Sequence, residues 1–114
     1  DIRSRFNRGE KKVVQAMKSW ASIAEQGRAA LLDGDRERLA GLVNENYDLR
    51  SRIYRISDGN QELIRTTRQV GATAKFAGSG GAIVGTYRNE RQFQRLVKTF
   101  HKIGVDVIQP QVAE

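Results

Sequence analysis

The residues best suited to chemistry form a run of four small ones, Gly78-Ser79-Gly80-Gly81, between two short apolar segments. Glycines lack a Cβ atom, so a ligand can approach the backbone while consecutive N–H groups point at the oxygens of a phosphate or sugar. Ser79 adds a hydroxyl donor. The same residues also suit an ordinary turn between strands, so the spacing alone leaves both interpretations open. The run matches neither GxxxxGK[ST] nor GxGxxG.

Other candidate chemistry is limited. Asn46 lies on or beside the apolar stripe of a predicted helix, and a buried amide must find hydrogen-bonding partners, so it is either structural or part of a site. The chain has no cysteine and a single histidine, His101, which excludes thiol catalysis, thiolate metal sites and a histidine metal site. We expect His101 to lie at the surface or at the edge of the core.

The net charge of +7 favours anionic partners, either nucleic acid or phosphorylated small molecules. Acidic residues are interleaved with the basic ones, which is typical of a solvated helical surface. No apolar run is long enough to span a membrane, and the first residues lack the apolar segment of a signal peptide. We expect a cytoplasmic protein. Because the chain begins with Asp1 rather than Met, we also expect a domain excised from a longer protein.

Three helices must precede the small-residue run. The first is predicted over about residues 10–32 and the second over about residues 36–54. Each carries an apolar stripe at helical spacing. The third opens at Asp58, which has capping-box spacing to Gln61, and it ends at Gly71. The buried face of the first helix is predicted to contain Val13, Met17, Trp20, Ala24, Gly27 and Leu31.

Residues 73–77 and 82–87 are predicted strands on either side of the run. A last helix begins after Asn89, and residues 105–108 are predicted to form a final strand. This order predicts an α+β fold: a small, mainly antiparallel sheet with helices packed on one face, preceded by a helical hairpin. The second half resembles a ferredoxin-like unit whose opening strand is missing. We expect a single domain over residues 1–114.

The order of these motifs resembles the C-terminal domain of the GHMP kinase superfamily, which includes galactokinase, homoserine kinase and mevalonate kinase. Those domains carry a helix with an Asn/His-rich turn, a helix ending in Gly-Ala, a lysine-bearing strand and a glycine-rich loop. The counterparts here are LVNENYDLRSRIY, GATAK and FAGSGGAIV. The most specific likeness is to the glucuronokinases, which share QGRAALL, DLR, a Lys-Phe pair before the loop and a Gly-Ser-Gly-Gly-Ala loop.

The resemblance implies roles for individual residues. Residues 78–81 would form a glycine loop that flanks the active site, braces the nucleotide-phosphate loop of another domain and lines the acceptor pocket. Asn46 and Arg50 match helix positions that face the acceptor, and the planar fork of Arg50 suits the carboxylate of a sugar acid. Lys75, on the strand that enters the loop, would neutralise phosphate; it is alternatively an edge-strand lysine.

The resemblance also implies an ATP-dependent sugar kinase that converts glucuronate to glucuronate 1-phosphate. The superfamily's Ser-Ser-Ala nucleotide loop, magnesium ligands and catalytic Asp are absent from this sequence, because they belong to an N-terminal ATP-binding domain. We therefore expect ATP and Mg²⁺ to be held mainly by that domain. The chain alone should be inactive, because phosphoryl transfer needs acceptor and phosphate in line. Its exposed sheet edge should favour self-association.

Other functions remain open. A heptose-phosphate kinase of the same superfamily also carries a basic residue after an aromatic one, as in Tyr47-Asp48-Leu49-Arg50. A basic, ferredoxin-like RNA-binding module fits the charge, although only Phe76 and Tyr87 could stack on bases and the RNP pattern is absent. A structural or dimerisation domain without a site is a third possibility. Ala82, where many superfamily members continue the glycine run, bears on which substrate is used.

Overall fold

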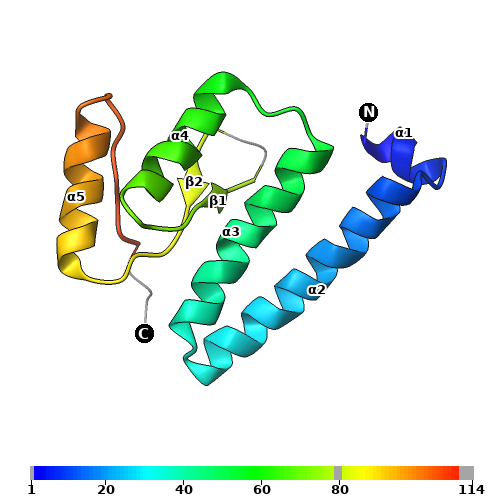
Figure 1. The fold of residues 1–114 in the computed structure, drawn as a ribbon, viewed down its shortest axis with the longest axis horizontal. Coiled ribbons are helices and arrows are strands. Elements are labelled where there is room, and N and C mark those ends of the chain that lie inside the picture. The colour runs from blue at the N-terminus through cyan, green and yellow to red at the C-terminus, as the bar shows by residue number, and fades with distance from the viewer. Residues whose placement is uncertain (1, 79–80, 111–114) are drawn as a thin grey trace.

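The computed structural model describes residues 2–78 and 81–110, which are mostly helical. The predicted hairpin is present: α2 (Lys11–Asp33) and α3 (Arg36–Ile53) are long helices joined by a short turn (Figure 1). A short helix that the sequence pattern did not predict, α1 (Ile2–Asn7), precedes them. Within the described ranges, no helix is long and apolar enough to cross a membrane.

The two helices of the hairpin, α2 and α3, pack against each other through small and branched apolar side chains. One end joins Val13 and Ala16 of α2 to Ile53 of α3, and the other joins Ile23 and Ala30 to Leu42. Ile23 and Ala30 are buried, whereas Ala24 is exposed and Leu31 is 66% exposed, so the prediction that Ala24 and Leu31 lie on the buried face is wrong. The buried stripe lies one residue earlier here, where a small side chain lets α3 approach α2 next to the turn.

The short helix α1 is held by one arginine. Arg5 forms a two-pronged ion pair with Glu10, at 2.8 and 3.0 Å, and its third guanidinium nitrogen donates to the carbonyl of Ile53 at 3.3 Å. The hydrogen bond from Arg5 lowers the pKa of the Glu10 carboxyl below its ordinary value. Arg5 therefore joins α1 to the C-terminal end of α3.

The next helix, α4 (Asp58–Gln69), has its N-cap one residue earlier than predicted. Its N-cap is Ser57, whose hydroxyl accepts a hydrogen bond from the backbone N–H of Asn60 at 3.3 Å, and Asp58 is the first helical residue. Gln61 does not complete a capping box, because its amide donates to the carbonyl of Ile56 at 2.8 Å. This bond fixes the path of the chain into α4.

The sheet consists of two short antiparallel strands, β1 (Lys75–Phe76) and β2 (Ile83–Val84). Phe76 pairs with Ile83, and both contact the apolar clusters formed with the helices. Side chains alternate across a strand, so Lys75 and its partner Val84 face the other side. Helices therefore cover one face of a small antiparallel sheet, and the predicted α+β fold class is confirmed.

The last helix, α5 (Glu90–His101), begins at the predicted cap, because the Asn89 side chain accepts a hydrogen bond from the N–H of Gln92 at 2.9 Å. The strand predicted over residues 105–108 is not formed; these residues run beside α5 without joining the sheet (Figure 1). Two of their side chains pack instead against the cluster of α4 and α5: Val105 and Val107.

The two strands come unusually close at Gly85. Hydrogen bonds continue the pairing beyond β1 and β2, from the Thr73 N–H to the carbonyl of Thr86 at 3.1 Å and between their hydroxyls at 2.7 Å. A Cβ atom on Gly85 would lie 1.7 Å from the carbonyl oxygen of Thr73. No side chain fits there unless the strands separate.

We therefore predict that Gly85→Ala lowers the free energy of unfolding by roughly 2 kcal/mol or more, because it forces the strands apart. Gly41→Ala is the matched control: its Cβ meets nothing within 4 Å on α3, and removing a helical glycine should raise stability by about 0.5–1 kcal/mol. Urea unfolding of both variants measures the difference. Equal midpoints for Gly85→Ala and the unmodified protein would contradict the close strand approach.

Candidate functional site

The glycine loop connects β1 to β2, and the structure describes its two outer residues. Gly78 has a φ of 94° and Gly81 a φ of 83°. L-residues with side chains rarely adopt these values, so the backbone itself requires glycine at both positions. Ser79 and Gly80 lie outside the described residues.

Arg50 of α3 holds the first end of the loop. Its Nη1 donates a hydrogen bond to the carbonyl of Gly78 at 2.7 Å. The guanidinium carbon lies 4.9 Å from the centre of the Phe76 ring and 5.2 Å from that of Tyr54. Guanidinium groups stack favourably on aromatic faces, so these two rings fix the group that binds the loop.

Asn60 of α4 holds the other end. The backbone N–H of Gly81 donates to Oδ1 of Asn60 at 3.3 Å, and the backbone of Asn60 is itself capped by Ser57. The two described ends of the glycine loop are thus attached to different helices. The sequence analysis did not find Asn60; the available signal was weak, an amide in the first turn of the helix that precedes the loop.

The three predicted acceptor-binding residues are not brought together. Arg50 contacts the loop, and Asn46 lies one turn before it on α3, where its backbone carbonyl accepts a hydrogen bond from the indole of Trp20 at 3.4 Å. Lys75 lies on the face of β1 opposite Phe76, and therefore opposite Arg50. Acceptor contact by these residues stays a prediction.

A different amide joins α3 to the sheet. Oδ1 of Asn44 accepts a hydrogen bond from the N–H of Ala74 at 3.0 Å. Its neighbour Tyr47 packs an edge against Phe76, with ring centres 5.5 Å apart. This aromatic pair places the ring of Tyr47 beside the one that supports Arg50.

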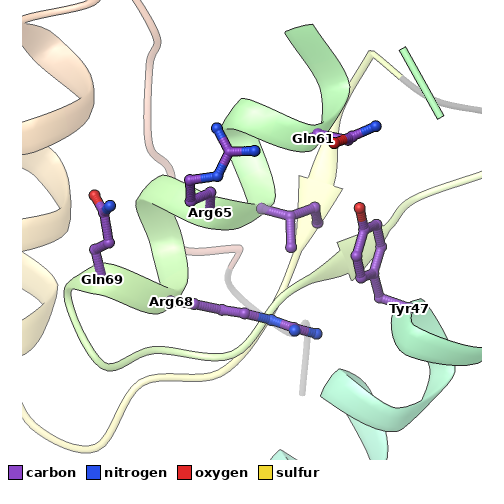
Figure 2. A pocket seen from close by; sticks show the side chains of 6 residues that line it. Tyr47, Gln61, Arg65, Arg68 and Gln69 are labelled. Atoms are coloured by element: carbon purple, nitrogen blue, oxygen red, sulfur yellow. The ribbon is translucent and has the colours of Figure 1, made fainter. Parts of the chain in front are cut away.

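A hollow opens next to this aromatic pair, between α3 and α4 (Figure 2). Its volume is about 420 Å³. Figure 2 shows Tyr47 rising from α3 opposite side chains of α4, with Arg65 and Arg68 leaving the helix in different directions. Guanidinium, phenol and amide groups suit an anionic or hydroxyl-rich ligand. The lining residues are Tyr47, Gln61, Ile64, Arg65, Arg68 and Gln69.

The two arginines of the hollow differ in their exposure and in their hydrogen-bonding partners. Arg68 donates to the carboxylate of Asp48 at 2.9 Å and to the carbonyl of Asn44 at 3.1 Å, and it lies over the ring of Tyr47. Arg65 is more exposed and pairs with Glu62 one turn earlier on α4. Arg68 therefore holds α4 against α3, whereas Arg65 is placed where a ligand could compete for it.

Metal binding and histidine chemistry find no support in the described part of the chain. It contains no group of three His, Cys, Asp or Glu side chains that could hold a metal ion. His101 is exposed at the end of α5, as expected.

Comparison with known proteins places this geometry in a family. Residues 28–106, which include α3, α4, both strands and α5, match the family model described as GHMP kinases C terminal. Glucuronokinase 1 of Arabidopsis thaliana is 41% identical over 86 residues, which are 73% of this chain and 24% of that protein. Probable glucuronokinase 2 of the same organism is 40% identical over 86 residues, with the same shares. The chain thus matches about a quarter of the length of these relatives.

A solved structure shares the fold. The crystal structure of L. major mevalonate kinase in complex with R-mevalonate superposes with a TM-score of 0.77 at 27% identity. The match covers 89% of this chain and 32% of that one. The arrangement of the helical hairpin and the small sheet therefore recurs in that kinase structure.

We predict different effects for the two arginines of the hollow. Arg68→Met should lower the free energy of unfolding by about 1–3 kcal/mol, because it removes charged hydrogen bonds between α3 and α4. Arg65→Met should change it by less than about 0.5 kcal/mol, because exposed ion pairs contribute little. Chemical denaturation of both variants tests this. A loss for Arg65→Met as large as that for Arg68→Met would contradict the assignment.

Proposed function

The chain belongs to the GHMP kinase C-terminal family, and on this premise we propose that it is the acceptor-binding part of an ATP-dependent sugar kinase. The full-length protein then phosphorylates the anomeric hydroxyl of glucuronate to give glucuronate 1-phosphate. The similarity to two glucuronokinases, which runs through the site, is the observation that carries this choice of acceptor.

The geometry suits a supporting role in phosphoryl transfer. Catalysis of this reaction depends mainly on positioning the acceptor and on neutralising phosphate charge. A backbone loop held from two helices can present a fixed surface to both reactants. ATP and Mg²⁺ are assigned mainly to an N-terminal domain of the full-length protein, and Mg²⁺ supplies charge neutralisation there. The described residues do not form a metal site, so no metal-dependent step is derived from this chain.

A positive side chain in the hollow between α3 and α4 supports a carboxylate-bearing acceptor. Arg65 lines this hollow together with Gln61. Guanidinium groups bind carboxylates with two parallel hydrogen bonds, which a neutral sugar cannot form. Asn46 and Lys75 remain proposed acceptor contacts on the strength of the family pattern. A cytoplasmic location, inactivity of the chain alone and its self-association belong to the same proposal.

The proposal predicts a clear substrate preference. In the full-length protein with ATP and Mg²⁺, glucuronate should give glucuronate 1-phosphate, detected by ³¹P NMR. Glucose is the matched control because it differs at the carboxylate. We expect a kcat/KM about 10- to 100-fold lower for glucose, the range for one lost charged hydrogen-bond pair. The chain alone should show no turnover.

The acceptor panel also includes a heptose phosphate, galactose and mevalonate. Preferential turnover of the heptose phosphate would favour the other superfamily activity considered from the sequence. Efficient turnover of a neutral hexose with no preference for glucuronate would contradict the sugar-acid assignment.

A further inference from the structure

We propose that Arg50 and Asn60 are positioning residues that act on the glycine loop, one at each end, and that kinase turnover depends on both. This inference rests on the proposed function, and it assigns Arg50 a role through the loop in place of direct contact with the acceptor. The observation behind it is the pair of hydrogen bonds from two different helices to Gly78 and Gly81.

The β-hairpin formed by β1 and β2, which carries the loop, has little stability of its own. Two residue pairs are in register between β1 and β2. The hydrogen bonds between Thr73 and Thr86 lie at the end away from the loop, and one from the Ala77 N–H to the carbonyl of Ala82 at 3.1 Å lies next to it. Isolated two-stranded hairpins are marginally stable in water. Glycines at both ends add backbone freedom, so contacts from outside the hairpin must decide where the loop lies.

The Arg50 contact is well suited to this task. Its short hydrogen bond to the Gly78 carbonyl comes from a charged donor, and such bonds are stronger than those between neutral groups. The rings of Phe76 and Tyr54 flank the guanidinium. The ring of Tyr54 also lies 6.3 Å from that of Trp20, so the contacts extend from the loop to α2.

The Asn60 contact is fixed from the helix side. Its backbone N–H is capped by Ser57, and the adjacent Gln61 amide donates to the carbonyl of Ile56. The side chain therefore leaves a well-defined first turn of α4 to accept the Gly81 N–H. Gly78 is thus held by a donor on α3 and Gly81 by an acceptor on α4.

Loss of either contact should appear in kcat. A small misplacement of groups that surround reacting atoms lowers rates by about 100-fold without loss of substrate affinity. In the full-length protein, we expect Arg50→Ala and Asn60→Ala to lower kcat about 10- to 100-fold while the KM for glucuronate changes less than about threefold.

Conservative and control variants distinguish a loss of loop positioning from a general loss of protein stability. Asn60→Asp keeps an oxygen that accepts the Gly81 N–H and should retain most of the kcat. Arg50→Lys should not restore kcat, because an ammonium lacks the planar group that stacks between the rings. Arg52→Ala, an exposed arginine on the same helix, should leave kcat and KM unchanged. A large rise in KM at unchanged kcat for Arg50→Ala would show direct acceptor contact and overturn the proposal.

A second measurement does not depend on which sugar is the substrate. Hydrogen exchange of the Gly81 amide, followed by NMR in full-length protein labelled with ¹⁵N-glycine, should be about tenfold faster in Asn60→Ala, the loss expected for one hydrogen bond. Asn60→Asp and Arg52→Ala should exchange like the unmodified protein.

Unchanged exchange in Asn60→Ala would overturn the anchoring itself. Faster exchange in a protein that phosphorylates no sugar would instead refute the proposed function and leave the anchoring intact. Should Arg50→Ala not fold, Asn60→Ala carries the test, since it removes a single side-chain contact.

Discussion

The structure depends on one contact, the hydrogen bond from Arg50 to the carbonyl of Gly78, made by a guanidinium that lies against Phe76 and Tyr54. It joins a long helix of the hairpin to the weakest part of the sheet. Without it, the short strand pairing and the Asn60 contact at Gly81 would have to determine the position of Gly78. A guanidinium group can pack on the aromatic rings and bind the carbonyl at the same time, because its planar faces stack on rings while its edge donates hydrogen bonds.

Polar side chains that bind main-chain groups also connect the other helices and the sheet. The buried side chains of the described residues form several separate small clusters, with α3 contributing to three of them. Such clusters do not by themselves fix how the helices and strands align, and polar side chains supply this alignment. Arg68 connects α4 to α3, Asn44 connects α3 to the chain next to β1, and Asn60 connects α4 to the loop. Each uses a backbone carbonyl or N–H as its partner, so it fixes main-chain positions directly. A chain built this way can hold Gly78 and Gly81, the described ends of the loop, without a large core.

Much of this protein follows from local sequence. Apolar periods and cap residues predicted the four longer helices to within a few residues, including the start of α5 after Asn89. The glycine loop stood out because missing Cβ atoms are visible in the sequence, and the positive φ values of Gly78 and Gly81 agree with that signal. The order of motifs also identified the family. These features are encoded within one or two helical turns of chain.

Tertiary structure decided which partner each side chain meets. Ala30 rather than Leu31 is buried because α3 lies on that side of α2. Asn44 rather than Asn46 reaches the sheet, and Lys75 faces away from Arg50, because the path of β1 relative to α3 sets the facing side. Residues 105–108 have strand-like composition but pack against α5 instead of pairing. By itself the sequence determined the four longer helices and the bare loop, since these depend on neighbours along the chain. Only the fold decided the loop's anchors, since Arg50 and Gly78 are 28 positions apart and Asn60 and Gly81 are 21.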